Sequence, residues 1–227
     1  MNKISSIKNE IGVYLDIRRN YLNPADYLKF RAGRKTALLT NRSTGGSLEF
    51  EKGKIRFSYK RRNVEFEYNT GELRFTPLPL TEIFFSEAYS PLRVRGMTVV
   101  DIGSSIGDTP VYFLLNGARK VYCYETDKFR ASIARSNIEK NGLSDKVEFF
   151  GEYDGRQADV AKIDCESCEY GLLRHFGKFK EIILEYHRGF GSIEKELRAQ
   201  GFAMTIKPSA EGIGIIYARK LAGMVET

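Results

Sequence analysis

The sequence contains no tryptophan, only two histidines and only three cysteines in 227 residues. Three cysteines are too few for a disulfide framework, and the odd number favours reduced thiols in a cytoplasmic protein. Cys165 and Cys168 form a C-x-x-C motif, but a structural zinc site needs four ligands, and only Cys123 and the two histidines could complete it. We therefore expect two partly buried thiols beside a strand end, and neither a metal site nor a redox pair.

Long apolar runs are also missing, so the sequence offers no segment of about 20 apolar residues that could span a membrane. Hydrophobic residues make up 42% of the chain and charged residues 29%, with 15 Phe and 13 Tyr. This composition is typical of a folded globular protein. The length allows one large domain, or one domain with a substantial appendage.

The positive charge is unevenly distributed along the chain. The net charge is +7, but residues 1–95 hold 18 Lys and Arg against 10 Asp and Glu, which gives +8. Residues 96–227 hold 18 basic against 19 acidic residues, which gives −1. Only the first region is therefore a candidate for binding an anionic partner such as nucleic acid.

Residues 1–95 are predicted to form a basic α+β region. Apolar residues recur at helical spacing near the start, a short helix is expected at 25–30, and from residue 35 the hydrophobic period changes to two. The expected antiparallel strands are 36–40, 47–51, 54–60, 63–69 and 72–76.

Residues 96–227 alternate between strand and helix, which predicts a mostly parallel sheet with helices on both faces. The expected strands are 98–102, 120–124, 146–150, 160–164 and 181–186, and the expected helices are 109–116, 128–140, 169–176 and 193–200. The last two segments, 202–207 and 214–219, lack an intervening helix and can form only an antiparallel hairpin.

The turn after the first strand of this second domain has the pattern Asp101-x-Gly103-x-x-x-Gly107. Asp101 would repel a pyrophosphate but could attract an ammonium group or orient donors. Glu125, at the end of the next strand, could accept hydrogen bonds from both hydroxyls of a ribose. The combination favours S-adenosylmethionine over a dinucleotide, although an ordinary turn with solvated carboxylates is the alternative. The predicted cofactor-binding residues are Asp101, Gly103, Ser104, Ser105, Gly107, Asp108, Thr109, Glu125 and Thr126.

Several of these segments resemble the FkbM-type S-adenosylmethionine-dependent methyltransferases, over residues 82–220. The matching parts are 99–109, 117–125, 137–141, 162–169 and 184–187. Segment 162–169, K-I-D-C-E-S-C-E, is similar to the family's K-I-D-x-E-G-x-E, with Ser167 in place of glycine; Ser104 likewise replaces alanine. The resemblance implies a Rossmann-like class I methyltransferase fold, a seven-stranded sheet ending in an antiparallel hairpin. It also implies methyl transfer, most often to oxygen.

Polar residues at the carboxyl ends of the strands are the candidates for catalysis. His187 could serve as a general base, oriented by Glu185 or Asp164, or could be a structural histidine hydrogen-bonded at a strand end. The residues Glu166 and Tyr89 are expected to contact the substrate. A Mg²⁺ site built on Asp164 and Glu166 is an alternative whose spacing fits no pattern we recognise. An acid at Glu169 suits a helix N-terminus whatever the function.

The function that we expect is O-methylation of a small molecule or glycan. An RNA (tRNA) methyltransferase is the alternative, with the basic N-terminal region, including segment 56–62 (R-F-S-Y-K-R-R), binding nucleic acid. No Asn-Pro-Pro-Tyr or Asp-Pro-Pro-Tyr segment, typical of enzymes that methylate exocyclic base nitrogens, follows the fourth strand. A protein that binds the cofactor without catalysis is a third interpretation. The sequence identifies neither the methyl acceptor nor the oligomeric state.

Overall fold

The computed structural model describes residues 14–15, 17–51, 53–68, 78–166, 168–210 and 212–221. The chain divides into two compact units, Met1–Ala88 and Tyr89–Thr227. Residues 89–95, which we grouped with the N-terminal region, belong to the second unit because they bond to it. The Tyr89 hydroxyl donates to Asp164, and Arg93 donates to Glu181.

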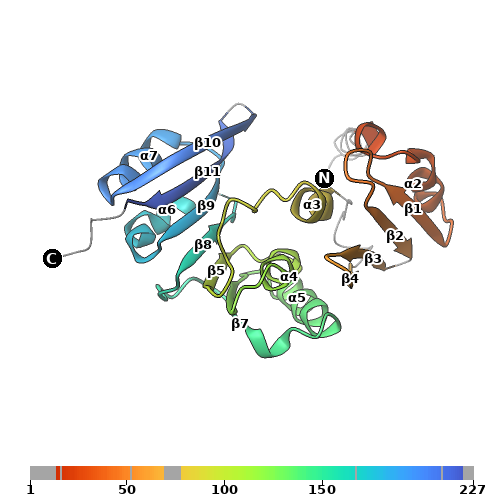
Figure 1. Ribbon diagram of the computed structural model, residues 1–227, viewed down its shortest axis with the longest axis horizontal. Helices are drawn as coiled ribbons and strands as arrows, with labels where there is room; N and C mark the ends of the chain where they lie inside the picture. The colour runs from red at the N-terminus through yellow and green to blue at the C-terminus, as the bar shows by residue number, and fades with distance from the viewer. Residues whose placement is uncertain are drawn as a thin grey trace. The chain divides into compact units, whose positions relative to one another are not determined.

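The first unit is built around a four-stranded antiparallel sheet of order β1-β2-β3-β4 (Figure 1). Its elements are α2 (Pro24–Arg31), β1 (Thr36–Thr40), β2 (Ser47–Glu51), β3 (Lys54–Tyr59), β4 (Arg62–Glu67), α3 (Leu78–Leu80) and the π-helix η1 (Thr81–Phe85). The expected helix and the first four strands are confirmed, each bound to within two residues. The fifth expected strand, 72–76, lies outside the described residues.

Alternation along β3 separates a buried face from a charged one. Ile55, Phe57 and Tyr59 are buried, and the Phe57 ring lies 4.9 Å from that of Phe84. The opposite face carries Arg56, but its guanidinium donates to two acids of the neighbouring strands. The basic character that the sequence shows along β3 is therefore neutralised by the cross-strand partners of this face.

The second unit holds a seven-stranded sheet of order β10-β11-β9-β8-β5-β6-β7. The strands are β5 (Thr98–Ile102), β6 (Lys120–Tyr124), β7 (Val147–Phe150), β8 (Val160–Ile163), β9 (Glu181–Tyr186), β10 (Phe202–Ala210) and β11 (Ile213–Lys220). Strands β5 to β9 pair in parallel, whereas β11 pairs antiparallel with both β9 and β10. The Rossmann-like sheet with a C-terminal antiparallel hairpin is thus confirmed, and Figure 1 shows the hairpin and β7 at opposite edges.

Helices and short turns connect these strands. They are α4 (Asp108–Leu115), α5 (Lys128–Lys140), η2 (Ser144–Lys146), α6 (Glu169–Leu172), the 3₁₀ segment η3 (Leu173–Lys178) and α7 (Phe190–Ala199). The helix expected at 169–176 is split into α6 and η3, and α7 begins before the predicted residue 193. In the part of the chain that the structure describes, no helix is both long and apolar enough to cross a membrane.

The two faces of the second sheet differ in chemistry. Val100 and Ile102 of β5 belong to an apolar cluster that also includes Ile193 and Leu197 of α7. Because side chains alternate along a strand, Asp101 points to the other face, where it meets Thr109 of α4. Buried polar groups such as Asp101 and Thr109 lie on this second face, near the carboxyl ends of the strands. The candidate functional site is located at these strand ends.

Candidate functional site

At two points of the turn between β5 and α4, the backbone has a φ that residues other than glycine rarely adopt. Gly103 has φ +82°, and a Cβ there would lie 1.8 Å from the carbonyl oxygen of Asp164. Gly107 has φ +86°, and a Cβ there would lie 3.1 Å from the carbonyl oxygen of Ala134. Both glycines are therefore required by the close approach of the protein's own backbone.

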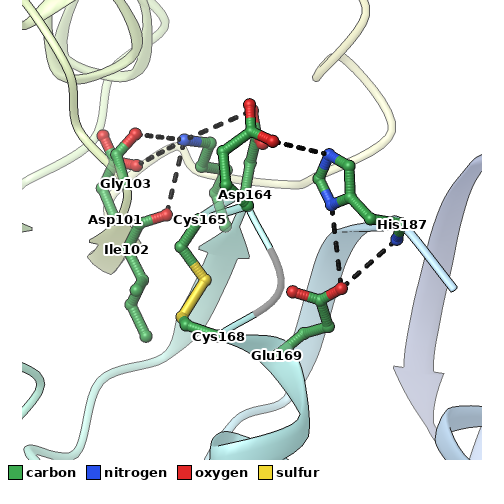
Figure 2. The surroundings of a disulfide bond; sticks show 10 residues. Asp101, Ile102, Gly103, Asp164, Cys165, Cys168, Glu169 and His187 are labelled. Carbon is green, nitrogen blue, oxygen red and sulfur yellow. Dashed lines mark hydrogen bonds and ion pairs between the residues drawn. A yellow bond between two sulfur atoms is a disulfide. The ribbon is translucent and has the colours of Figure 1, made fainter. Parts of the chain in front are cut away.

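Asp101, which is labelled in Figure 2, is fully buried at the end of β5. Its carboxylate lies 3.2 Å from the Lys162 ammonium and accepts a hydrogen bond of 2.6 Å from the Thr109 hydroxyl. Burial raises the pKa of Asp101, while Lys162 and Thr109 act in the opposite direction. The sequence suggests that Asp101 attracts an ammonium group of a ligand, whereas the ammonium beside it in the structure is that of Lys162, and the Asp101 carboxylate has no exposed surface.

Lys162 is a site residue that our sequence reasoning did not select. Its side chain is 2% exposed, and Nζ donates to the Gly103 carbonyl at 2.7 Å and lies 3.9 Å from Asp164. Burial lowers the pKa of Lys162, but the carboxylates of Asp101, Asp164 and Asp108 outweigh it, so the pKa is raised. The sequence did contain a signal for Lys162. A lysine within a buried parallel strand needs an anionic partner, and Asp101 stands opposite it in the register of β5 and β8.

Glu125, at the end of β6, lies against the same turn. Its Oε2 accepts the Ser105 N–H at 3.0 Å, and its Oε1 accepts the Asp127 N–H at 2.9 Å. Glu125 is half-buried and the adjacent Thr126 is exposed, so this end of the site is open to solvent. The structure thus brings the glycine turn and the second acid together, as the sequence predicts.

Three further predicted cofactor residues lie in the turn and at the start of α4. Ser104, Asp108 and Thr109 are all buried. Burial raises the pKa of Asp108 to about 6, against opposing effects of Lys162 and of the Thr109 N–H that it accepts. Their side chains therefore support the turn, and only backbone groups of this segment are candidates for direct contact with a ligand.

The other half of the site gathers at the ends of β8 and β9. Ligand atoms of Asp164, Glu185 and His187 all lie within 4.8 Å of one another. The Tyr89 hydroxyl donates to Asp164 Oδ2 at 3.3 Å. Burial, and then the charge of Asp164, raise the pKa of Tyr89 well above its ordinary value, so this phenol remains a neutral donor.

The imidazole of His187 lies between two carboxylates. Nε2 is 3.5 Å from Glu166 Oε2, and Nδ1 is 3.7 Å from Glu169 Oε1. The same Glu169 oxygen accepts the backbone N–H of His187 at 3.2 Å (Figure 2). Glu166 is 86% exposed, whereas the Glu169 side chain is fully buried. The interpretation of Glu169 as merely a helix-start acid therefore missed its contact with the imidazole.

The expectation of two reduced thiols is wrong, because Cys165 and Cys168 form a disulfide (Figure 2). The turn between β8 and α6 brings their Cα atoms to 5.5 Å, within the range that a disulfide spans. The low, odd number of cysteines argues against a disulfide framework, and we also set aside a redox role for the C-x-x-C motif, but neither argument excludes a local disulfide between residues three positions apart. Cys123 is a buried free thiol, and burial raises its pKa well above the ordinary value.

Asp164, Glu185 and His187 could also supply ligands to a metal ion. This set differs from the Asp164 and Glu166 pair considered from the sequence. Asp164 already accepts the Tyr89 hydroxyl and lies near the Lys162 ammonium. Because the charge of Asp164 is partly compensated by these neighbours, Asp164, Glu185 and His187 together attract a metal cation less than two carboxylates and an imidazole ordinarily would.

Solved structures of methyltransferases share this fold. One is a precorrin-6y C5,15-methyltransferase from Geobacter metallireducens, with a TM-score of 0.52, 13% identity and coverage of 69% of this chain and 94% of the other. Another, from Streptococcus pneumoniae and assigned as a tRNA (m1A22) methyltransferase, is in complex with S-adenosyl-L-methionine. It has a TM-score of 0.51 and 18% identity, over 62% of this chain and 73% of the other. At these identities the likeness shows the fold of class I methyltransferases.

Sequence comparison finds viral relatives, while no family model matches the chain. The uncharacterized protein 65 of Sulfolobus islandicus filamentous virus is 30% identical over 90 residues, which span 39% of this chain and 57% of the relative. The uncharacterized protein 158B of Sulfolobus islandicus rod-shaped virus 1 is 33% identical over 108 residues, 45% of this chain and 68% of the relative. The chain therefore belongs to the same family as protein 158B of that virus.

Proposed function

We propose that the protein is an S-adenosylmethionine-dependent methyltransferase of the FkbM type that methylates an oxygen atom of a small molecule or glycan. The observation that carries this proposal is the convergence of two groups at the carboxyl ends of neighbouring strands. The glycine turn and Glu125 lie at the ends of β5 and β6, and Asp164 and His187 follow β8 and β9. Ligands of open α/β sheets bind at this edge. A fold neighbour in complex with S-adenosyl-L-methionine supports the choice of cofactor.

The residues present offer a side chain for the ribose of the cofactor but only backbone groups for its methionine end. Glu125 is half-buried beside exposed Thr126, and its carboxylate could exchange backbone partners for ribose hydroxyls. At the methionine end, N–H groups at the start of α4 suit a carboxylate. Asp101 cannot reach the amino group, so we assign it to holding Lys162 and Thr109. When bound, the cofactor supplies an electrophilic methyl group on a sulfonium.

The chain's own residues account for the acceptor side. His187 Nε2 would take the proton of the acceptor hydroxyl, which would leave an oxygen nucleophile for the methyl group that the bound cofactor would supply. Asp164, Glu185 and Glu166 surround the imidazole and supply acceptors for further hydroxyls of a substrate. Tyr89 donates its hydroxyl to Asp164 and so adds a further polar group beside these acceptors.

Cofactor binding is tested by calorimetry with S-adenosylmethionine. We expect micromolar affinity in the wild type, and Glu125→Ala should weaken binding by about tenfold, because the lost acceptor bonds carry charge. Glu194→Ala, which removes an acid of α7 paired with Arg198, is the matched control and should leave the affinity unchanged. Absence of binding to the wild type would contradict the proposed function.

An RNA methyltransferase is the second candidate, favoured by the charge of the first unit. Met1–Ala88 carries 16 basic and 10 acidic residues, hence +6, and two arginines at the β3–β4 connection are exposed: Arg61 in the turn and Arg62 at the start of β4. The two candidates are separated by transfer of labelled methyl groups into fractionated cell extract. Label in the small-molecule or glycan pool supports the first, and label in RNA supports the second. Cofactor binding without any labelled product would indicate a binding protein.

A further inference from the structure

The two ring nitrogens of His187 have neighbours that differ in burial. Nδ1 faces Glu169, whose side chain has 0% exposure, and Nε2 faces Glu166, whose side chain has 86% exposure. Glu169 also holds the backbone of His187 through its N–H, so it is fixed relative to the ring. Because Glu166 is exposed, it can move away from Nε2 into solvent, whereas the buried Glu169 stays beside Nδ1.

The buried carboxylate lacks enough partners without the imidazole. Glu169 Oε2 and His187 Nδ1 are both buried atoms with no hydrogen-bond partner among the described residues. The Nδ1 to Oε1 distance is 3.7 Å, so an approach of roughly 0.5–1 Å would give an ordinary hydrogen bond. A hydrogen bond from His187 Nδ1–H to the Glu169 carboxylate would compensate the buried negative charge and give Nδ1 a partner.

We propose that Glu169 is a positioning residue that holds the neutral His187 ring in the Nδ1–H tautomer, leaving Nε2 free to accept the proton of the methyl acceptor. A neutral imidazole donates from one nitrogen and accepts at the other, so a fixed acceptor at Nδ1 decides which nitrogen is the base. After proton transfer, the Glu169 carboxylate lies beside the imidazolium and stabilises its charge. This inference rests on the proposed function only for its catalytic consequence, because the tautomer is a property of the protein alone.

The tautomer is measured by long-range ¹H–¹⁵N correlation NMR on the full chain without added cofactor, at a pH where the imidazoles are neutral. Only two histidines contribute, and His187→Asn assigns the signals, which leaves His175 as an internal reference. We expect Nδ1–H to predominate for His187 in the wild type. Glu169→Gln should reduce the ratio of Nδ1–H to Nε2–H about tenfold, since it replaces a charge-assisted bond by a neutral one. Glu169→Met is a second variant, which removes the acceptor entirely and should shift the ratio further.

Glu166→Gln is the matched control, because it removes the carboxylate on the other side of the same ring; it should leave Nδ1–H predominant. A wild-type ring with mainly Nε2–H, or an unchanged ratio in the Glu169 variants, would overturn the inference. In turnover assays, Glu169→Gln should lower kcat about tenfold with little change in the KM for the cofactor. If the wild type transfers no methyl group but shows the Nδ1–H tautomer, the proposed function fails and the positioning role of Glu169 stands.

Discussion

At the scale of single residues, the site is organised by charges that are buried and compensated. Lys162 lies among Asp101, Asp108 and Asp164, and its ammonium also binds the carbonyl of Gly103. Removal of Lys162 would leave the buried Asp101 carboxylate without a counter-charge, and an uncompensated buried charge is strongly destabilising. These residues therefore stabilise the shape of the turn, and in the proposed function the ligands contact their half-exposed neighbours.

Gly103 gives the sharpest single-residue prediction for stability. In Gly103→Ala, the new Cβ meets the Asp164 carbonyl at 1.8 Å and the residue keeps φ near +82°, so we expect a loss of about 3 kcal/mol or more in the free energy of unfolding. Gly142→Ala is the control: φ is +67° but nothing lies within 4 Å, and the loss should be about 1 kcal/mol. Urea denaturation measures both, and equal losses would refute the steric argument.

Asp108 predicts a pH dependence of stability. Its folded pKa of about 6 lies above the ordinary value of 3.8, so the native state binds the proton more tightly and the free energy of unfolding falls as pH rises from 4 to 6. In Asp108→Asn the side chain does not titrate, so this fall in the free energy of unfolding with rising pH should disappear. We expect the variant to be more stable than the wild type by up to about 3 kcal/mol at pH 7.5, with little difference at pH 4, in urea denaturation.

Asp159 is a control for this prediction, because its pKa is shifted in the opposite direction from that of Asp108. Hydrogen bonds from Lys180 and Thr98 lower its pKa to about 2, so its contribution is present above pH 4 and is lost as pH falls toward 2. Asp159→Asn should therefore destabilise the protein at pH 7.5. The same response from both variants would contradict the assignment of the two shifts.

At the scale of elements, the loop between β8 and α6 connects the two halves of the site. It carries Asp164 and Glu166, the latter with a left-handed φ of 53°, and the disulfide closes it just before Glu169. A non-glycine residue in that region is strained and needs support from its surroundings. The disulfide supplies part of this support because it limits the conformations of the loop.

Reduction should therefore lower thermal stability. A bond between residues three positions apart contributes about 2 kcal/mol by loop entropy, which for a chain of this size corresponds to a fall in Tm of roughly 4–8 °C. Scanning calorimetry with and without dithiothreitol measures the change. The double variant Cys165→Ser with Cys168→Ser should show the lower Tm in both conditions, and a wild type insensitive to reductant would contradict the prediction.

At the scale of the whole molecule, the excess positive charge and the proposed chemistry lie in different units. Met1–Ala88 carries +6, whereas Tyr89–Thr227, with 20 basic and 19 acidic residues, carries +1. In the first unit, Arg56 is paired with Glu51 and Glu65, so charge counted along the chain overstates the charge that the sheet face presents. The charge therefore bears on partners of the first unit and not on catalysis.

Any binding of tRNA should consequently depend on the turn and not on the sheet face. Arg61→Gln with Arg62→Gln should reduce the slope of log affinity against log salt by about 2, because two phosphate contacts are lost. Arg56→Gln should hardly change it, since that guanidinium is already paired. Filter binding over a salt series measures the slopes, and an equal effect of both variants would contradict this distinction.

The sequence by itself determined most helices and strands, the parallel sheet with its hairpin, and the proximity of the glycine turn to Glu125. These features follow from hydrophobic period, turn residues and the rule that parallel strands end at one edge, all of which are local or topological. Tertiary structure alone decided that Lys162 neutralises Asp101, that Glu169 lies behind His187, and that Cys165 bonds Cys168. Such contacts depend on strand register, burial and loop conformation, which place side chains to within an ångström or two and leave no periodic signal in the chain.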